Sequence, residues 1–449
     1  MTETAAGAAA RQVALELLLG KGDFPTRRFA AAADAAGLQG RDRGLARELV
    51  SGVIRRRRTL DALFKAYSDR RTVEPEVLWT LRLAVYQRFF LQNVPAYAAF
   101  DATLEAAKPR LGRALGFCNA VLRALDRDAT RHERAEILEA AANRLDLDFA
   151  SWEFGRAVFP DPDAEPTAYW AVSLSYPDVL VERWFEQAGA GKALARLRAL
   201  NQAPPLTLRV NARRATAASV LEAFQNVGIG ATQAPIPDAL LLEDPPGEVS
   251  ALPGFAEGLW SVQDLQGQEA VALAKPSAGE KVLDLCAAPG GKSFAAAERG
   301  AEVTACDVDA ERLKLLDEDA RRLGHPVSSH VISHGGKGVP SGEWDLVILD
   351  VPCSNTGVLG RRPEARWRFT LAELGRCVKE QKSIIKWALP AHVGSRTRVL
   401  WSTCSLEPEE NGRGAERAAR RAGLQVLETR SFEPDARRSG GFAAVLGRA

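Results

Sequence analysis

The apolar positions divide the chain into a front region of helical spacing and a back region of short apolar runs. Through the first 128 residues, apolar side chains recur every three or four positions, and prolines interrupt the pattern at Pro75 and Pro95. Short connections between such helices favour antiparallel neighbours. Residues 1–128 are therefore expected to form an all-α bundle, with helices over 13–19, 45–50, 76–91, 98–107 and 111–125.

The periodicity is weaker in the middle of the chain. Residues 129–170 include the run Asp-Pro-Asp-Ala-Glu-Pro at 161–166 and are expected to be a linker. Residues 171–266 mix helical patterns with a strand candidate at 206–210, which predicts a small α/β module. This module is too small to be a catalytic unit, so any catalytic site is expected further along the chain.

From residue 267 to residue 449, short apolar strands alternate with helical segments. This alternation is typical of a parallel sheet covered by helices, which is a Rossmann-like α/β domain. Such sheets place their binding and catalytic residues at the carboxyl ends of the strands. Strands are expected over 282–285, 302–307, 331–332, 345–350 and 398–402, and a long helix is expected over 371–389.

A glycine turn follows the first of these strands and precedes a helix. Glycine lets the backbone approach a ligand closely, and the first N–H groups of a helix point toward it. Asp307 ends the second strand about 20 residues later, where an acid suits the ribose hydroxyls of an adenosine-containing ligand. A glycine after a strand is often purely structural, so the residues downstream are needed to support a ligand-binding role for this turn. Its residues are Cys286, Ala287, Ala288, Pro289, Gly290, Gly291 and Lys292.

Two cysteines follow the ends of two later strands. Cys353 comes after the strand that ends at Asp350, and Cys404 comes after the fifth strand. A thiolate is a strong soft nucleophile. Added across C6 of a cytosine, it makes C5 reactive enough to attack a sulfonium methyl group. Each cysteine taken alone could also be a small core residue, as is expected for Cys286, Cys306 and Cys377.

Composition and charge narrow the class of protein. The 449 residues contain no apolar run of membrane-spanning length and no secretory leader pattern, which favours a cytoplasmic chain without a membrane partner. The six cysteines form no CxxC pair, so neither structural zinc nor a disulfide framework is expected. Residues 1–128 hold 21 Lys and Arg against 14 Asp and Glu, although the whole chain is only +2. This excess suggests a polyanionic partner.

Two groups of residues are candidates for contact with a polyanion such as RNA. Arg55, Arg56, Arg57 and Arg58 form a basic cluster suited to phosphate contacts, and the alternative is an exposed solubilising face. Arg209 and Asn211 stand at the end of the middle strand and could contact RNA or cap the local turn.

The front region resembles the NusB-type RNA-binding domain. The resemblance covers most of residues 10–128. The matching segments are Arg41-Asp42-Arg43 with 46–53, Leu81-Arg82-Leu83-Ala84-Val85-Tyr86-Gln87 with 94–99, and Gly116-Phe117-Cys118-Asn119-Ala120-Val121-Leu122-Arg123.

The whole chain resembles the bacterial RsmB (also Sun or Fmu) family of 16S rRNA cytosine-C5 methyltransferases. The order and spacing of the motifs are specific to RNA cytosine-C5 methylation, and Ser261-Val262-Gln263-Asp264 also matches. The motifs are Asp284-Leu285-Cys286-Ala287-Ala288-Pro289-Gly290-Gly291-Lys292, Asp350-Val351-Pro352-Cys353-Ser354-Asn355-Thr356-Gly357 and Ser402-Thr403-Cys404-Ser405-Leu406-Glu407-Pro408-Glu409-Glu410-Asn411.

This resemblance implies a multidomain protein. Its parts would be a NusB-like bundle (1–128), a linker (129–170), a small α/β RNA-binding module (171–266) and a class I S-adenosylmethionine-dependent methyltransferase domain (267–449). It implies Cys404 as the nucleophile, Cys353 as a helper in resolving the adduct, and Asp350 at the cytosine edge or the methyl-donor end. Residues 286–292 and Asp307 would bind S-adenosylmethionine.

Two positions depart from the family pattern. His334 stands where an acid near the adenine is usual, and the terminal motif is reduced to Ser439-Gly440-Gly441-Phe442-Ala443. Two other functions stay open: a cytosine-C5 methyltransferase acting on tRNA or DNA, and a non-catalytic RNA-binding assembly factor. DNA enzymes of this chemistry use the Pro-Cys thiol as nucleophile, so Cys404 disfavours DNA. Small-subunit rRNA is the expected partner, and a monomer is expected.

Overall fold

The computed structural model describes residues 7–20, 22, 24–70, 72–92, 94–133, 139–243 and 248–448. Contacts between residues divide the chain into two compact units. The first, the helical unit, consists of residues 1–197 together with 362–367. The second, the sheet unit, consists of residues 198–361 and 368–449. The helical unit therefore includes a short segment that lies far along the sequence.

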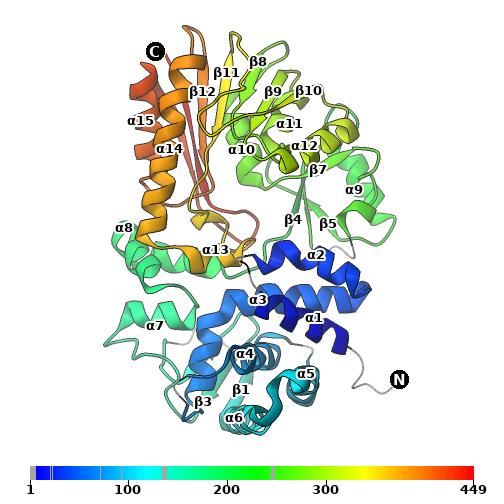
Figure 1. Cartoon of the computed structure of the whole chain (residues 1–449), viewed down its shortest axis with the longest axis vertical. Helices are drawn as coiled ribbons and strands as arrows, with labels where there is room; N and C mark the ends of the chain where they lie inside the picture. The colour runs from blue at the N-terminus through cyan, green and yellow to red at the C-terminus, as the bar shows by residue number, and fades with distance from the viewer. Residues whose placement is uncertain are drawn as a thin grey trace. The chain divides into compact units, whose positions relative to one another are not determined.

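The helical unit is built on six helices from the front of the chain, as the periodicity predicts (Figure 1). Their apolar faces form one core that includes the fully buried Leu49, Leu81 and Phe100. The helix expected over 45–50 extends much further and includes the four consecutive arginines. The helices are α1 (Ala8–Leu19), α2 (Pro25–Ala35), α3 (Gly40–Lys65), α4 (Pro75–Phe90), α5 (Ala96–Leu111) and α6 (Leu115–Asp128), with the short η2 (Gly112–Ala114) before α6.

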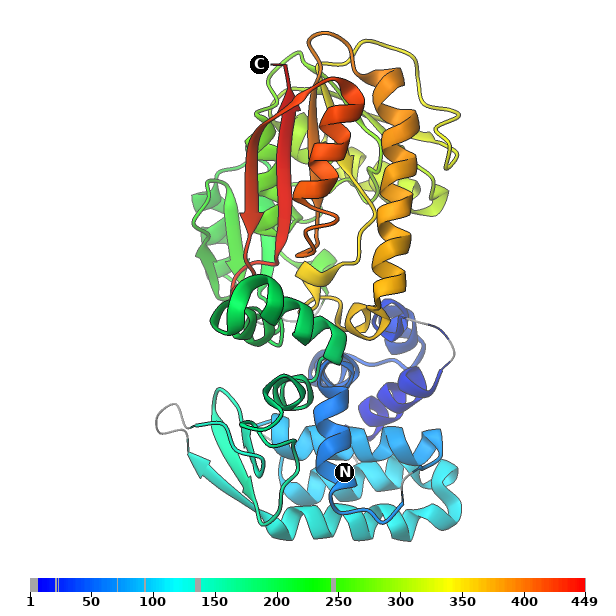
Figure 2. The same cartoon turned by 90° about the vertical axis from the view of Figure 1, so that its left-hand side faces the viewer.

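Residues 129–170 are not the expected linker. They contain a three-stranded antiparallel sheet in the order β1-β3-β2, which lies beside the helices of the same unit (Figure 2). Trp152 and Phe154 of β3 pack against Phe89, with ring centroids 4.9 and 5.8 Å apart. The prediction was wrong because strands of three to five residues are too short to give a periodic signal. The elements are β1 (Ala129–Glu133), β2 (Arg144–Asp146), β3 (Ala150–Phe154) and α7 (Pro166–Ser173).

Helix α8 (Asp178–Ala199) is interrupted at Gly189, whose φ is 74°, and the boundary between the two units falls after its residue Leu197. Beyond it, the expected small α/β module is a four-stranded antiparallel sheet in the order β5-β6-β4-β7. Its core holds Leu208, Phe224 and Trp260. The elements are β4 (Leu206–Val210), α9 (Ala217–Gln225), β5 (Ala231–Gln233), β6 (Ala239–Leu242), η3 (Val249–Ala251) and β7 (Trp260–Val262).

The rest of the sheet unit is organised on a seven-stranded sheet in the order β10-β9-β8-β11-β12-β14-β13. The first five strands are parallel, and β14 and β13 join antiparallel at one edge. The strands are β8 (Lys281–Asp284), β9 (Glu302–Asp307), β10 (Val327–Val331), β11 (Leu346–Asp350), β12 (Arg398–Thr403), β13 (Gln425–Phe432) and β14 (Gly441–Gly447). The third strand therefore begins earlier than the expected 331–332.

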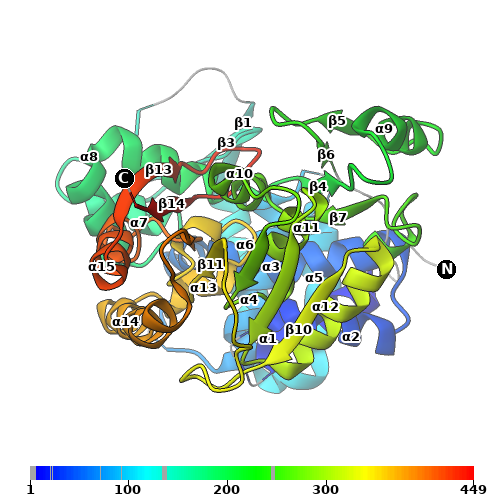
Figure 3. The same cartoon turned by 90° about the horizontal axis from the view of Figure 1, so that it is seen from above.

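Helices cover both faces of this sheet (Figure 3). Side chains alternate between the faces along each strand, so Val282 contacts one layer of helices and Leu283 the other. One layer holds α10, α11 and α12, and the other holds α14 and α15. The helices are α10 (Leu265–Ala274), α11 (Gly291–Glu298), α12 (Ala310–Leu323), α14 (Leu371–His392) and α15 (Gly412–Ala422), with η4 (Thr356–Val358) and α13 (Pro363–Arg368) between β11 and α14.

Candidate active site

The order of the strands brings the predicted motifs to one edge of the sheet. Strand β11 lies between β8 and β12, and its register places Asp350 opposite Ser402 and Ile348 opposite Asp284. All three strands are parallel, so the turns that follow them leave the sheet on the same side. The glycine turn, the Cys353 loop and the Cys404 loop therefore converge.

The two cysteines face each other. The Sγ atoms of Cys353 and Cys404 lie 3.1 Å apart as free thiols. Cys404 donates to the side-chain oxygen of Asn355 at 3.2 Å, and the amide nitrogen of Asn355 donates to the Cys353 carbonyl at 2.8 Å. The hydrogen bond with Cys404 and burial together raise the pKa of Cys353 well above its ordinary value. The Cys353 thiol therefore stays protonated beside the other sulfur.

A buried carboxylate joins the two cysteine loops. Glu410 is fully buried and accepts hydrogen bonds from the backbone N–H of Ser354 at 2.9 Å and from its hydroxyl at 2.5 Å. Burial raises the pKa of Glu410, although these hydrogen bonds oppose the shift. A backbone bond from Gly357 to the Cys404 carbonyl at 2.9 Å joins the loops again. The motif includes Glu410, but sequence reasoning assigned it no role because its partner is 56 residues away.

An ion pair lies between the glycine turn and the end of β11. The ammonium group of Lys292 is 2.7 Å from a carboxylate oxygen of Asp350. Burial lowers the pKa of Lys292, but the charge and hydrogen bond of Asp350 outweigh burial, so the net shift is upward. The negative charge of a Cys404 thiolate also stabilises the charged lysine. The sequence named both residues, and only the structure pairs them.

The turn after β8 requires glycine at position 290 for its backbone conformation and local packing, and Asp307 lies beside it. Gly290 has a φ of 108°, and a Cβ added there would lie 2.5 Å from the ring of Phe294. Asp307 at the end of β9 accepts from the backbone N–H of Ala288 at 2.9 Å, which fixes the acid beside the turn. Backbone N–H groups of a turn can donate to a bound ligand, and a strand-end carboxylate can accept from the ribose hydroxyls of an adenosine. Residues 286–292 and Asp307 therefore suit S-adenosylmethionine.

Arg209 and Asn211 do not face RNA in this structure. Arg209 is buried, pairs with Glu298 at 2.8 Å and donates to the Gly291 carbonyl at 2.7 Å. Asn211 is also buried and donates to the carbonyls of Gly258 at 3.0 Å and Leu323 at 2.9 Å. Both side chains therefore support the glycine turn and neighbouring loops from inside the sheet unit.

The four arginines of α3 do not form one exposed face either. Arg55 is buried, Arg56 lies over the Phe90 ring, and Arg57 lies over the Trp367 ring. Arg58 donates to the Tyr176 carbonyl and pairs with Asp178, both at 2.8 Å. Successive residues of a helix point about 100° apart, so four in a row cannot share a face. The prediction that residues 55–58 form one exposed phosphate-binding cluster is therefore wrong.

The two departures from the family pattern lie in different settings. His334 is exposed in the turn after β10, and its effect on a bound adenine stays a prediction. In the reduced terminal motif, Ser439 is buried and its hydroxyl donates to Asp264 at 2.8 Å. Gly440 donates from its backbone to the Gly357 carbonyl at 2.8 Å. This loop therefore still contacts the cysteine loops without the usual acid.

Across the residues that the structure describes, no helix is long and apolar enough to cross a membrane. Within the same residues, no group of three or more His, Cys, Asp or Glu side chains is arranged to hold a metal ion.

The sheet order, the glycine turn and the strand-end acid define a class I S-adenosylmethionine-dependent methyltransferase. Three family models match: the NusB family over residues 8–127, the RsmF/B-like ferredoxin-like domain over 176–249, and the 16S rRNA methyltransferase RsmB/F over 270–443. The chain belongs to the RsmB/F family and is an RNA cytosine-C5 methyltransferase that uses S-adenosylmethionine.

Individual relatives agree with this assignment. The chain is 33% identical over 388 residues to the "Probable ribosomal RNA small subunit methyltransferase B" of Synechocystis sp., covering 84% of this chain and 80% of the relative. It is 33% identical over 424 residues to ribosomal RNA small subunit methyltransferase B of Vibrio cholerae, covering 91% and 86%. The crystal structure of PH0851 is 20% identical with a TM-score of 0.74, covering 98% and 99%, and supports the fold.

Proposed function

We propose that this protein methylates C5 of a cytosine in small-subunit rRNA through a covalent bond between Cys404 and C6. The observation that carries the proposal is the pair of thiols 3.1 Å apart at the ends of neighbouring parallel strands. The names of the relatives support small-subunit rRNA as the substrate. The target cytosine must leave its stack before a sulfur atom can reach C6.

In the first step, the Cys404 thiolate adds to C6 and the C5–C6 π electrons move toward N3. The ammonium group of Lys292 favours the thiolate form of Cys404. The proton that the Cys404 thiol gives up passes to N3, and Asp350, held by Lys292, would accept a hydrogen bond from the N3/N4 edge of the ring. C5 is then enamine-like. S-adenosylmethionine, held by residues 286–292 and Asp307, would supply the methyl group to C5, and its sulfur would keep the electron pair of the broken sulfur–methyl bond.

In the second step, the adduct breaks down. The proton on C5 is removed, its electron pair reforms the C5–C6 double bond, and the C6–sulfur bond breaks toward Cys404. The protonated Cys353 donates its proton to the departing sulfur and receives the proton from C5, so both thiols are restored. The proton on N3 is then released to solvent, which accounts for the positive charge that the sulfonium brought in. The raised pKa of Cys353 suits this relay, because the thiol is protonated when the sulfur leaves.

The roles of the two thiols are separated by single substitutions. Cys404→Ala is expected to abolish both methyl transfer and the covalent adduct. Cys353→Ala is expected to form the adduct but release it slowly, so an RNA–protein band accumulates on a denaturing gel. Cys377→Ala, a buried cysteine of α14, is the control and should turn over normally. Methylation by Cys404→Ala, or normal turnover by Cys353→Ala, would contradict the mechanism.

The substrate is tested with labelled S-adenosylmethionine and deproteinised small-subunit rRNA from a strain lacking this gene, beside tRNA. One cytosine becoming protected from bisulfite in the rRNA is the expected result. Label found only in tRNA would show that the substrate is tRNA and not rRNA, with the same cytosine-C5 chemistry. Absence of label together with absence of S-adenosylmethionine binding would favour the non-catalytic assembly factor.

We also propose that the protein acts as a cytoplasmic monomer, with a NusB-like domain at 1–128 and a methyltransferase domain at 267–449. The RNA-binding module expected at 171–266 would begin only at residue 198, since 171–197 belong to the helical unit. Ribosomal RNA of bacteria is made in the cytoplasm, and all six cysteines are free thiols. Light scattering after size exclusion is expected to give the mass of one 48.5 kDa chain. A mass twice as large would overturn the monomer.

A further inference from the structure

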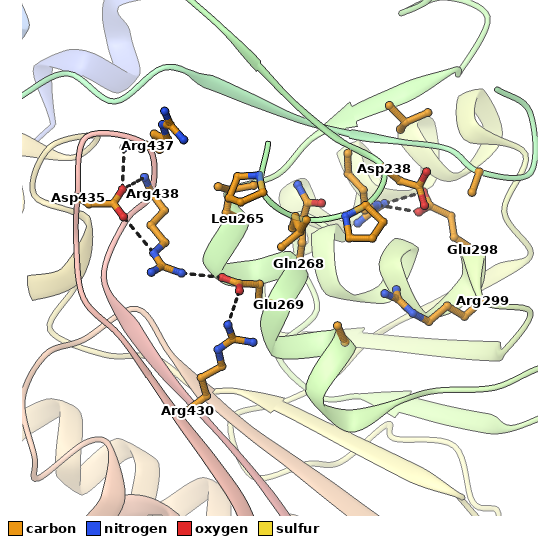
Figure 4. Close-up of a pocket in the computed structure, with 17 residues that line it drawn as sticks. Asp238, Leu265, Gln268, Glu269, Glu298, Arg299, Arg430, Asp435, Arg437 and Arg438 are labelled. Atoms are coloured by element: carbon orange, nitrogen blue, oxygen red, sulfur yellow. Dashed lines mark hydrogen bonds and ion pairs between the residues drawn. The ribbon is translucent and has the colours of Figure 1, made fainter. Parts of the chain in front are cut away.

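A second cavity lies in the sheet unit, outside the site that holds the two thiols (Figure 4). Its volume is about 690 Å³, within the range of small-molecule sites. Its walls come from the end of β4, the 235–238 turn before β6, helix α10, the end of α11 and the loop between β13 and β14. None of the glycine-turn residues or the cysteines lines it.

One wall of the cavity is apolar. Pro235 and Pro237 are exposed and flank the half-buried Ile236 in the turn before β6. Leu265 of α10 also lines the cavity. An exposed apolar wall beside open space suits a flat ring, because every nucleobase has an apolar face that packs on such surfaces.

The charged residues that line the cavity are five arginines and four carboxylates, the latter being Asp238, Glu269, Glu298 and Asp435. Arg430 at 2.7 Å and Arg438 at 3.1 Å converge on the buried Glu269 (Figure 4). Arg299 and Arg437 are exposed on opposite sides of the cavity (Figure 4). One guanidinium N–H of Arg299 donates to the Ala295 carbonyl at 2.8 Å, and its other N–H groups can still contact a phosphate. Neither side chain has a carboxylate partner among the residues that the structure describes. Two separated guanidinium groups suit the successive phosphates on either side of one nucleotide.

Hydrogen bonds connect the cavity wall to the cysteine loops. The 435–438 segment continues into Ser439, which is bonded to Asp264 just before α10. Gly440 then bonds to Gly357, and Gly357 bonds to the Cys404 carbonyl. The loop that lines the cavity is therefore held directly to the loops that carry the two thiols.

We propose that this cavity binds one unstacked nucleotide of the substrate RNA, away from the cytosine that is methylated. Its base packs on the Pro235–Pro237 wall, and its flanking phosphates contact Arg299 and Arg437. Arg430 and Arg438 stay on Glu269 and keep the loop in place. The inference rests on the RNA methyltransferase function and adds a contact that selects the strand.

The experiment compares two double variants with the wild-type protein on small-subunit rRNA. Arg299→Gln with Arg437→Gln removes both proposed phosphate contacts. Arg420→Gln with Arg421→Gln removes the same charge from the exposed end of α15 and is the matched control. Binding is measured by filter retention at several salt concentrations, and KM and kcat are measured by methyl transfer.

The cavity variant is expected to raise KM for rRNA about tenfold with kcat unchanged. The slope of the logarithm of the binding constant against the logarithm of salt concentration should become shallower by about 1.4, or about 0.7 for each lost phosphate contact. A benzophenone side chain at Ile236 is expected to crosslink to rRNA. If the cavity variant matches the control in KM and salt slope, or no crosslink forms, the proposal is wrong. If the wild-type protein does not methylate rRNA, it is the proposed function that fails.

Discussion

At the residue scale, burial sets the protonation of side chains around the glycine turn. Asp284 ends β8, is 1% exposed and accepts a hydrogen bond from the Ser293 hydroxyl at 2.7 Å. Burial raises the pKa of Asp284 to about 7, although Ser293 opposes the shift. The motif names this aspartate, but its neutral form at mildly acidic pH follows only from the packed surroundings.

The first prediction concerns pH and stability. The pKa of Asp284 rises from 3.8 to about 7 on folding, so the folded state binds more protons between about pH 4 and about pH 7. Stability therefore falls as pH rises through this window, by about 4 kcal/mol, since each pKa unit is worth about 1.4 kcal/mol. Asp284→Asn is expected to remove this decline in urea unfolding, and Asp317→Asn on α12 is expected to keep it. An unchanged pH dependence in Asp284→Asn would contradict the assignment.

The second prediction concerns the ion pair of Lys292 and Asp350. Lys292→Met removes the cation that holds Asp350 and stabilises the Cys404 thiolate. We expect kcat to fall about 100-fold, a typical contribution of a positioned proton-handling group. KM for rRNA should change little, and less adduct should form when the reaction is stopped early. Lys281→Met at the exposed start of β8 is the control.

At the element scale, the loops that follow β11 and β12 are joined by hydrogen bonds of their own, in addition to the ladder between the two strands. Thr356 accepts from the Leu406 N–H at 2.9 Å, and the Ser354 and Ser405 hydroxyls lie 3.2 Å apart. Gln381 of α14 donates to the Pro352 carbonyl at 2.9 Å. These buried contacts hold the two sulfur atoms at a fixed separation, which a two-thiol reaction needs.

The third prediction concerns the carboxylate that joins these loops. Glu410→Ala leaves the N–H and hydroxyl of Ser354 without their acceptor and is expected to destabilise the sheet unit by about 3 kcal/mol. Glu410→Gln keeps one acceptor oxygen and should restore part of the activity. A positioning role for Glu410 predicts that kcat of Glu410→Ala falls by a larger factor than its KM rises. Glu416→Ala, exposed on α15, is the control. Equal loss of kcat in Glu410→Ala and Glu410→Gln would contradict a positioning role.

At the scale of the whole molecule, the helical unit is not continuous in sequence. Residues 362–367, at the start of α13, belong to it although they follow the cysteine loop of the sheet unit. Arg366 is fully buried there, lies 3.7 Å from the Tyr176 ring centroid and donates to the carbonyls of Arg55 and Ser175, both at 2.8 Å. Trp367 donates to the Ile54 carbonyl at 2.7 Å. The chain therefore passes from one unit to the other after residues 197, 361 and 367.

The fourth prediction concerns this segment. Burial lowers the pKa of Arg366 to about 10, so its charge carries a cost. Arg366→Met removes that cost but leaves two buried carbonyls without their donor, and the second effect is expected to be larger, for a net loss of about 2 kcal/mol. Hydrogen exchange of α3 amides should become faster. Arg368→Met, more exposed in the same helix, is the control, and unchanged exchange in the Arg366 variant would contradict the argument.

Much of the architecture and chemistry was predictable because it depends on local patterns. Helical spacing identified the bundle, strand and helix alternation identified the sheet, and the strand ends located Cys353 and Cys404. The linker over 129–170 was wrong because its three strands are short, and their pairing across the chain leaves no local signal. Four consecutive arginines looked like a patch only because the sequence does not show how a helix distributes them.

By itself, the sequence determined the fold class, the family and the identity of the reactive groups, since each depends on residue type, order and spacing. The tertiary structure decided which groups meet. It placed the two sulfur atoms 3.1 Å apart, paired Lys292 with Asp350, and turned Arg209 inward onto Glu298. These outcomes depend on contacts between residues far apart in the chain, where distances and burial arise only after the strands and helices have packed.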